Sequence, residues 1–132
     1  MRSEDNKYIL HEKYLVIKNL GVGIDVVDIE RFRKLPYKTN KSFYHKIFSR
    51  SEIRYCLKQK NSSQHFAGKF AIKEAVKKSL PIKIQMIGIV TSHKKSKPQI
   101  ELDKQLPYNF LISVSHDARV AVAVVISQQI SK

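Results

Sequence analysis

Two carboxylates of this 132-residue chain stand at positions where a purely structural protein would place apolar side chains. Asp25 interrupts a stretch of valine and isoleucine, and Glu74 falls on a helical row of small apolar residues. Ionised carboxylates are seldom buried unless they are paired or bind a metal. Two of them in one cleft would form an oxygen-ligand site suited to Mg²⁺, which takes one or two protein carboxylates together with water and substrate phosphates. The alternative is that Asp25 faces solvent and that Glu74 pairs with Lys78 one helical turn further on.

Four lysines on the same predicted helix could supply positive charge to such a site. Lys69 and Lys78 lie on either side of Glu74 in the sequence, which suits both of them to phosphate binding. The alternative for these lysines is a solvated helix face. That is our interpretation for Lys77, and it extends to Lys73.

His116 lies at the tip of a predicted C-terminal hairpin, close to the hydroxyls of Ser113 and Ser115. A histidine in this setting either donates to a phosphate or nucleotide, or is a surface residue without a role. The sequence contains no P-loop, dinucleotide-binding glycine motif, Ser-His-Asp arrangement or zinc spacing. From residue types and spacing alone, the prediction therefore stops at a magnesium and phosphate site.

Composition and turn signals predict the first elements that must position these side chains. Residues 20–29 are rich in valine and isoleucine, which indicates a strand. Gly21 and Gly23 within it indicate a bend or a close backbone approach. A short helix over 30–35 would end before Pro36.

Two longer helices are predicted in the middle of the chain. Ser49 and Glu52 have the spacing of a capping box, so a helix is expected over about 51–59. The clearest helix is 63–80, whose apolar residues recur at three- and four-residue intervals and which ends before Pro81.

The C-terminal half is predicted to contain strands at 85–92, 99–102, 110–115 and 119–127. The last two would form a hairpin. One early strand, two helical segments and several late strands predict an α+β fold, in which a largely antiparallel sheet packs against one long helix and short helices.

Length and composition predict a single domain over 1–132, with a polar N-terminal arm at 1–16 that lacks the apolar stretch of a signal peptide. The apolar runs are too short to span a bilayer, so we expect no membrane association and a cytoplasmic location. The formal net charge of +14 attracts polyanions such as nucleic acid, an anionic membrane, a phosphate-rich cofactor or an acidic protein. A nucleic-acid-binding module is the main alternative to an enzyme, although the aromatic residues are not interleaved with the basic ones as such a module needs.

Four segments over about residues 21–126 resemble the motifs of the holo-acyl-carrier-protein synthase type of 4'-phosphopantetheinyl transferase. The segment GVGIDVVDIER at 21–31 is similar to the family's opening strand, and FSRSEIRYC at 48–56 to its FTxxExxYC segment. The segment FAGKFAIKEAVKK at 66–78 is similar to the helix FAxRFAAKEAxxKA, and SVSHD at 113–117 to the late SxSH motif. Each motif is moderately specific. The resemblance is stronger because all four occur in the same order as in the family.

The resemblance implies an enzyme that moves 4'-phosphopantetheine from coenzyme A to a serine of an apo acyl carrier protein and releases 3',5'-ADP. It implies Asp25 and Glu74 as ligands of Mg²⁺ and Lys78 as the lysine that offsets phosphate charge. Glu74 is our first choice for the base that takes the serine proton, and Asp28 is a weaker candidate. A carrier of fatty acid biosynthesis is implied, with a polyketide or another pathway left open.

The resemblance also implies how coenzyme A and the carrier protein bind. Lys69, Lys78, Pro98 and His116 would contact coenzyme A, with His116 near the adenosine 3'-phosphate and the turn before Pro98 beside the adenine. Arg31 would contact the acidic carrier protein. The family implies a homotrimer with active sites between subunits.

Three departures from the family pattern bear on these expectations. Lys69 replaces an arginine, which keeps the charge but loses bidentate phosphate binding. Ser96 replaces a glycine of the turn, and LPIK at 80–83 replaces the usual LGTG loop. Coenzyme A is therefore expected to bind more weakly or in a different arrangement, and a catalytically inactive scaffold of the same fold is the second alternative to an active enzyme.

Overall fold

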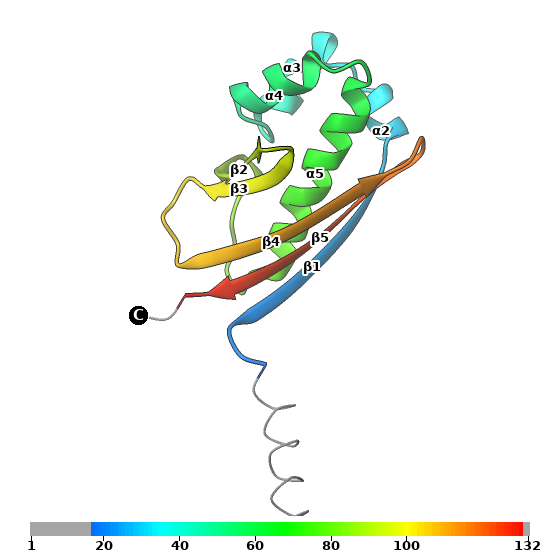
Figure 1. Ribbon diagram of the computed structural model, residues 1–132. Coiled ribbons are helices and arrows are strands. Elements are labelled where there is room, and N and C mark those ends of the chain that lie inside the picture. The colour runs from blue at the N-terminus through cyan, green and yellow to red at the C-terminus, as the bar shows by residue number, and fades with distance from the viewer. Residues whose placement is uncertain (1–16, 131–132) are drawn as a thin grey trace, which may run out of the picture.

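The computed structural model describes residues 17–130, so the predicted arm at 1–16 lies outside the described residues. Within them the chain has the expected α+β fold (Figure 1). None of the helices in this part of the chain has the length and apolar character needed to cross a membrane. The elements, in which η denotes a short 3₁₀ helix, are β1 (Leu20–Asp28), α2 (Glu30–Arg33), η1 (Tyr37–Thr39), α3 (Lys41–His45), α4 (Arg50–Leu57), α5 (Ser62–Ser79), η2 (Met86–Gly88), β2 (Ile89–Lys94), β3 (Lys97–Leu102), β4 (Tyr108–His116) and β5 (Val120–Gln129).

The strands form two antiparallel sheets. β1, β5 and β4 lie in that order in a three-stranded sheet, and β2 pairs with β3 as a hairpin. The helices and the hairpin lie on one side of the three-stranded sheet, and α5 crosses that side (Figure 1). Small buried residues of β5, Ala121 and Ala123, lie on this covered face, which allows α5 to pack close to the sheet.

β1 and α5 approach each other more closely than side chains would allow. A Cβ atom added at Gly21 would overlap the carbonyl oxygen of Ser79, and one added at Gly23 would overlap that of Ala75. Neither glycine has a positive φ, so the sequence needs space at these positions and not backbone freedom. The predicted close approach is confirmed.

An aromatic cluster joins the short helices to the N-terminal half of α5. Its centre is Phe32 of α2, whose ring centroid lies 5.6–6.4 Å from the rings of Phe43, Tyr44, Phe48, Phe66 and Phe70. Aromatic pairs in tilted and edge-to-face arrangements add to the stabilisation that burial gives. The cluster therefore holds α2, and with it the end of β1, against α5.

A buried charge network joins α4, α5 and β2. α4 begins with the predicted capping box, in which Ser49 N donates to Glu52 Oε1 (2.8 Å) and Glu52 N donates to Ser49 Oγ (3.2 Å). The Glu52 carboxylate also accepts from Lys73 Nζ (2.7 Å) and from both N and Oγ1 of Thr91 (2.6 Å each). Burial opposes ionisation of Glu52, but Lys73 and these hydrogen bonds outweigh it and hold its pKa below the usual value.

The prediction of a solvated face for Lys73 is wrong. Its side chain is 0% exposed, and its ammonium donates to the carbonyl oxygens of Ile47 (2.7 Å) and Met86 (3.2 Å) as well as to Glu52. Because α5 contacts strands of both sheets and also α2 and α4, little of its surface in this region is left to solvent.

Other details also differ from the sequence prediction. His116, expected at the tip of the C-terminal hairpin, is the last residue of β4 and pairs with Ala121 of β5. Residues 86–88, expected at the start of a strand, form η2, and β2 begins only at Ile89. The short elements η1 and α3 were not predicted, because each is too short for a hydrophobic period to be visible.

Candidate active site

Asp25 lies on the covered face of β1 and contacts α5. Its side chain is 15% exposed, and Oδ1 accepts a hydrogen bond from Lys78 Nζ (3.0 Å), which also donates to the carbonyl oxygen of Ile24 (3.1 Å). The strand alternation leaves Val22, Ile24 and Val26 on the opposite face. The alternative in which Asp25 faces solvent on a polar side of the strand is therefore wrong, because the open side of β1 is apolar.

Glu74 lies on α5 next to this pair. Gly23 of β1 packs against Ala75 of α5. From Gly23 to Asp25 the strand advances by about 6.6 Å, slightly more than one helical turn of about 5.4 Å. Asp25 therefore lies beside the preceding turn of α5, which ends at Glu74. Within residues 17–130, Glu74 has no hydrogen-bond or ion-pair partner, and the alternative Glu74–Lys78 pair is not formed because Lys78 reaches Asp25 instead. We call Asp25, Glu74 and Lys78 the carboxylate site.

A pocket of about 130 Å³ contains three of the four residues predicted to contact coenzyme A, namely Lys69, Pro98 and His116. Lys69 is only 5% exposed, its Nζ donates to Thr91 Oγ1 (2.8 Å), and it lies 4.9 Å from the centre of the Tyr55 ring. Burial lowers the pKa of Lys69. In the described part of the chain no carboxylate lies within ion-pair distance of its ammonium.

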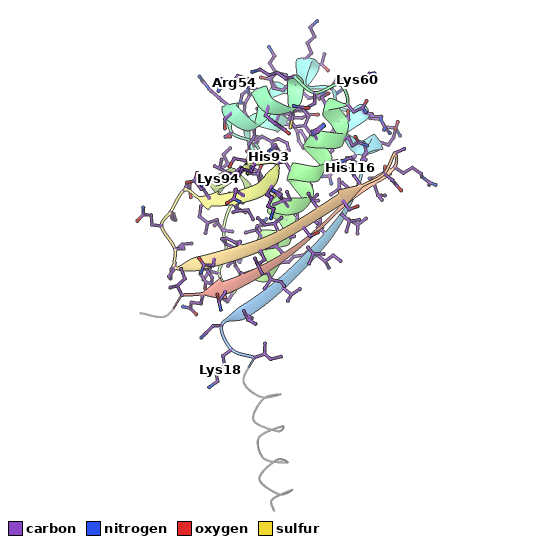
Figure 2. All side chains as sticks on the ribbon, viewed as in Figure 1. Lys18, Arg54, Lys60, His93, Lys94 and His116 are labelled. Atoms are coloured by element: carbon purple, nitrogen blue, oxygen red, sulfur yellow. The ribbon has the colours of Figure 1, made fainter. Side chains whose placement is uncertain are left out.

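Sequence reasoning missed two members of this pocket, His65 and His93. His65 precedes Lys69 by four residues, so helical spacing could have placed the two on one face. His93 is the cross-strand partner of Pro98 in the β2–β3 hairpin, which only a correct strand register would have predicted. We call the cavity lined by His65, Lys69, His93 and His116 the histidine pocket (Figure 2 labels His93 and His116).

The two sites lie on opposite sides of α5. Lys69 and Lys78 are nine residues apart, which at 3.6 residues per turn rotates the side-chain direction by about 900°, or two full turns and a half. Consistent with this, Lys69 contacts β2 through Thr91, whereas Lys78 contacts β1 through Asp25. The structure therefore brings Lys78 together with the carboxylates and not with the other residues predicted to contact coenzyme A.

Arg31, predicted to contact the carrier protein, is exposed on α2 near the end of β1. Its guanidinium lies 4.8 Å from the centre of the Phe70 ring, a cation–π contact that holds the side chain against α5.

Comparison with known proteins identifies the class to which this fold and these sites belong. The family model of the 4'-phosphopantetheinyl transferase superfamily (ACPS) matches residues 21–125. The chain belongs to this family.

Curated relatives within the family carry a more specific name. The chain is 35% identical over 123 residues to the holo-[acyl-carrier-protein] synthase of Geobacter sp. strain M21, which covers 83% of this chain and 98% of the relative. It is 34% identical over 115 residues to the protein of the same name from Chlorobaculum parvum, with the same coverage.

Solved structures agree with these relatives. Helicobacter pylori holo-[acyl-carrier-protein] synthase in complex with coenzyme A is 33% identical, with a TM-score of 0.69 over 81% of this chain and 99% of that one. The Bacillus anthracis holo-(acyl-carrier-protein) synthase in complex with CoA (3',5'-ADP) has a TM-score of 0.71 over 83% of this chain and 96% of that one, and its 24% identity supports the fold alone.

Proposed function

We propose that this chain is a holo-[acyl-carrier-protein] synthase, which transfers 4'-phosphopantetheine from coenzyme A to a serine of an apo acyl carrier protein in a Mg²⁺-dependent reaction. The observation that carries the proposal is the contact between Asp25 and Lys78 beside Glu74, at the three positions where the family motifs place the reaction. The names of the relatives and the coenzyme A bound in the Helicobacter pylori structure support the substrate assignment.

The carboxylate site fits a magnesium ion. It offers carboxylate oxygens from Asp25 and Glu74, the donor type that Mg²⁺ prefers, and Glu74 has no competing partner within the described residues. The Asp25 carboxylate already binds one cationic group, the Lys78 ammonium. Bound there, Mg²⁺ would supply Lewis-acid stabilisation of the diphosphate of coenzyme A.

The chain's own residues account for the remaining chemistry. The serine oxygen of the carrier forms a bond to the β-phosphorus of coenzyme A, and the bond from that phosphorus to the oxygen of 3',5'-ADP breaks. Glu74 takes the serine proton, directly or through a water molecule. Lys78, released from Asp25 or shared with it, offsets the negative charge that develops on the leaving phosphate.

The histidine pocket supports the proposed coenzyme A contacts of Lys69, Pro98 and His116. All three line one cavity, and Lys69 faces it as a buried cation without an ion-pair partner in the described region. Because Lys78 lies on the other side of α5, one copy of the chain does not present all four contacts to the same coenzyme A molecule.

The position of Lys78 on the other side of α5 from the remaining coenzyme A contacts supports a homotrimer with active sites between copies. The face of the three-stranded sheet opposite α5 is apolar, and we call it the open face. Three of its residues, Val22, Val26 and Leu111, are 66%, 60% and 71% exposed. Contiguous exposed apolar surface of this kind marks an interaction site. In strand register its apolar residues are Leu20, Val22, Ile24 and Val26 of β1, Val120, Val122, Val124 and Ile126 of β5, and Leu111 of β4.

The carrier protein is proposed to contact Arg31, since the net charge of +14 favours encounter with an acidic partner. A cytoplasmic location and a role in fatty acid biosynthesis belong to the same proposal.

The proposal is tested by mixing the purified protein with apo acyl carrier protein, coenzyme A and Mg²⁺ and weighing the intact carrier by mass spectrometry. We expect a gain of one phosphopantetheine, which disappears with EDTA and with Asp25→Ala. Glu101→Ala, which removes an exposed acid of β3 outside both sites, should leave the gain intact. The absence of any gain across several carrier proteins would reject the activity in favour of an inactive scaffold.

A further inference from the structure

Three histidines from three different elements surround the histidine pocket. His65 comes from α5, His93 from β2 and His116 from β4, and Figure 2 shows the last two close to α5. Among the described residues, the lining also includes Lys69 but no aspartate or glutamate. A cavity lined by four basic groups and no acid favours an anionic occupant.

The rings are positioned by contacts with one another. The His93 ring stacks on Tyr55 with centroids 4.8 Å apart, and Tyr55 meets His65 edge-on at 6.0 Å. His65 in turn lies 6.4 Å from His116. Within residues 17–130 no ring nitrogen of these three histidines has a protein hydrogen-bond partner, so the nitrogens are available to a ligand.

Lys69 contributes a charge that has no direct ion pair among the described residues. Its one hydrogen bond is to Thr91 Oγ1, which itself donates to Glu52 Oε2 (2.6 Å), so the nearest carboxylate is reached only through a hydroxyl. The Cys56 thiol behind it has its pKa raised by burial to about 12 and is neutral. The ammonium therefore keeps donors for an occupant of the pocket.

Burial and neighbouring positive charge both disfavour protonation of His65 and His93. Burial, then the charges of His116 and Lys69, lower the pKa of His65. Burial, then Lys69 and His65, lower the pKa of His93. The nearest acid on the β4 side, Asp117, accepts hydrogen bonds from the backbone of the turn that follows it and does not line the cavity. An anion in the pocket would reverse these effects, because an opposite charge favours the protonated imidazole.

The size of the cavity limits what can enter. Its volume of about 130 Å³ corresponds to roughly four water molecules at about 30 Å³ each. That is room for a phosphate group, so the phosphate of a larger ester fits inside.

We infer that the histidine pocket is a proton-coupled phosphate site, in which His65 and His93 each take up a proton as a phosphate group binds beside Lys69. That the phosphate belongs to coenzyme A or 3',5'-ADP rests on the proposed function, whereas the proton coupling depends only on the pocket. Binding weakens as pH rises through the histidine pKa values of the complex. A pKa raised by one unit on binding corresponds to roughly a tenfold gain in affinity for each histidine.

The inference is tested by NMR titration of the histidine Cε1–H signals, assigned with His65→Gln and His93→Gln. The full chain is titrated alone, with 3',5'-ADP, with 5'-AMP and with inorganic phosphate. We expect 3',5'-ADP to raise the pKa of His65 and His93 by about one unit or more. His45, which lies on α3 and contacts Tyr37 outside the pocket, is the internal control and should not change.

The titrations with different ligands distinguish a failure of the inference from a failure of the proposed function. A rise with inorganic phosphate but not with 3',5'-ADP supports the pocket and counts against coenzyme A as its source. Unchanged pKa values of His65 and His93 while 3',5'-ADP demonstrably binds would overturn the proton coupling, as would the absence of a response to every phosphate. In binding measurements His93→Gln should weaken 3',5'-ADP binding at pH 6 and flatten its pH dependence, and His45→Gln should do neither.

Discussion

Glu52 and Glu74 are acids of adjacent helices in different surroundings. Each oxygen of Glu52 accepts two hydrogen bonds, which come from Ser49, Lys73 and Thr91. Glu74, within the described residues, accepts none. A carboxylate whose oxygens are already occupied stabilises the fold, whereas one without partners beside a second carboxylate is available for a metal or a proton.

Glu74→Gln should lower the transfer rate by about 10²- to 10⁴-fold, the usual contribution of a general base. Thermal stability should change little, because Glu74 has no hydrogen bond to lose within residues 17–130. Rates are measured from the mass of the carrier protein, and melting by circular dichroism. Glu101→Gln is the matched control. Near-normal turnover of Glu74→Gln would remove Glu74 from the reaction.

Glu52→Gln, in contrast to Glu74→Gln, should reduce stability. It should lower the free energy of unfolding by about 3–5 kcal/mol, because it leaves Lys73 buried and unpaired. Since the pKa of Glu52 is lowered in the folded state, its contribution is present above the unfolded value of about 4.3 and is lost as pH falls through the folded value. Denaturant unfolding from pH 7 down to acid pH should show the two proteins converging. A pH-independent difference would contradict the assignment.

At the scale of elements, composition and capping signals predicted every element that holds the site. β1, α4 and α5 begin and end within one or two residues of the expected bounds, and the capping box of Ser49 and Glu52 is confirmed. The surroundings of Lys73 were not predictable in this way, because its partner Glu52 comes from another helix. The same holds for His93, whose place in the pocket depends on the register of a hairpin.

Gly23→Ala should destabilise the protein by roughly 1–3 kcal/mol, because the added Cβ overlaps the Ala75 carbonyl and forces β1 away from α5. Gly68→Ala is a control with the opposite sign. The nearest atom to its added Cβ is Val114 Cγ2 at 3.8 Å, an ordinary contact, so better helix propensity should raise stability by up to about 1 kcal/mol. Denaturant midpoints measure both changes, and equal effects of the two substitutions would contradict the close-packing argument.

On the scale of the whole molecule, the three-stranded sheet has one face covered by helices and one apolar face that no described element covers (Figure 1). An antiparallel sheet commonly exposes one face to water, but that face is then polar. The open face lacks this polarity along most of β1 and β5, which is why we assign it to contacts between copies.

Leu111→Glu should convert the proposed trimer to monomers, because a charge on the open face is left without water or a partner when copies meet. Leu111 is 71% exposed in the single chain, so the fold itself should be unaffected. Light scattering after size-exclusion chromatography measures the assembly, and far-ultraviolet circular dichroism checks the fold. Transfer activity should fall with the assembly. A Leu111→Glu protein that remains trimeric would show that the contacts lie elsewhere.

The opposite orientation of Lys69 and Lys78 on α5 has a consequence for mixed populations of chains. If each active site takes its carboxylate site from one copy and its histidine pocket from the next, inactivating substitutions fall into two complementation groups. A Glu74→Gln chain still offers an intact histidine pocket, and a His116→Ala chain still offers an intact carboxylate site. Co-assembled, these two defective chains rebuild a complete site wherever their intact halves meet, whereas two chains defective in the same half never do.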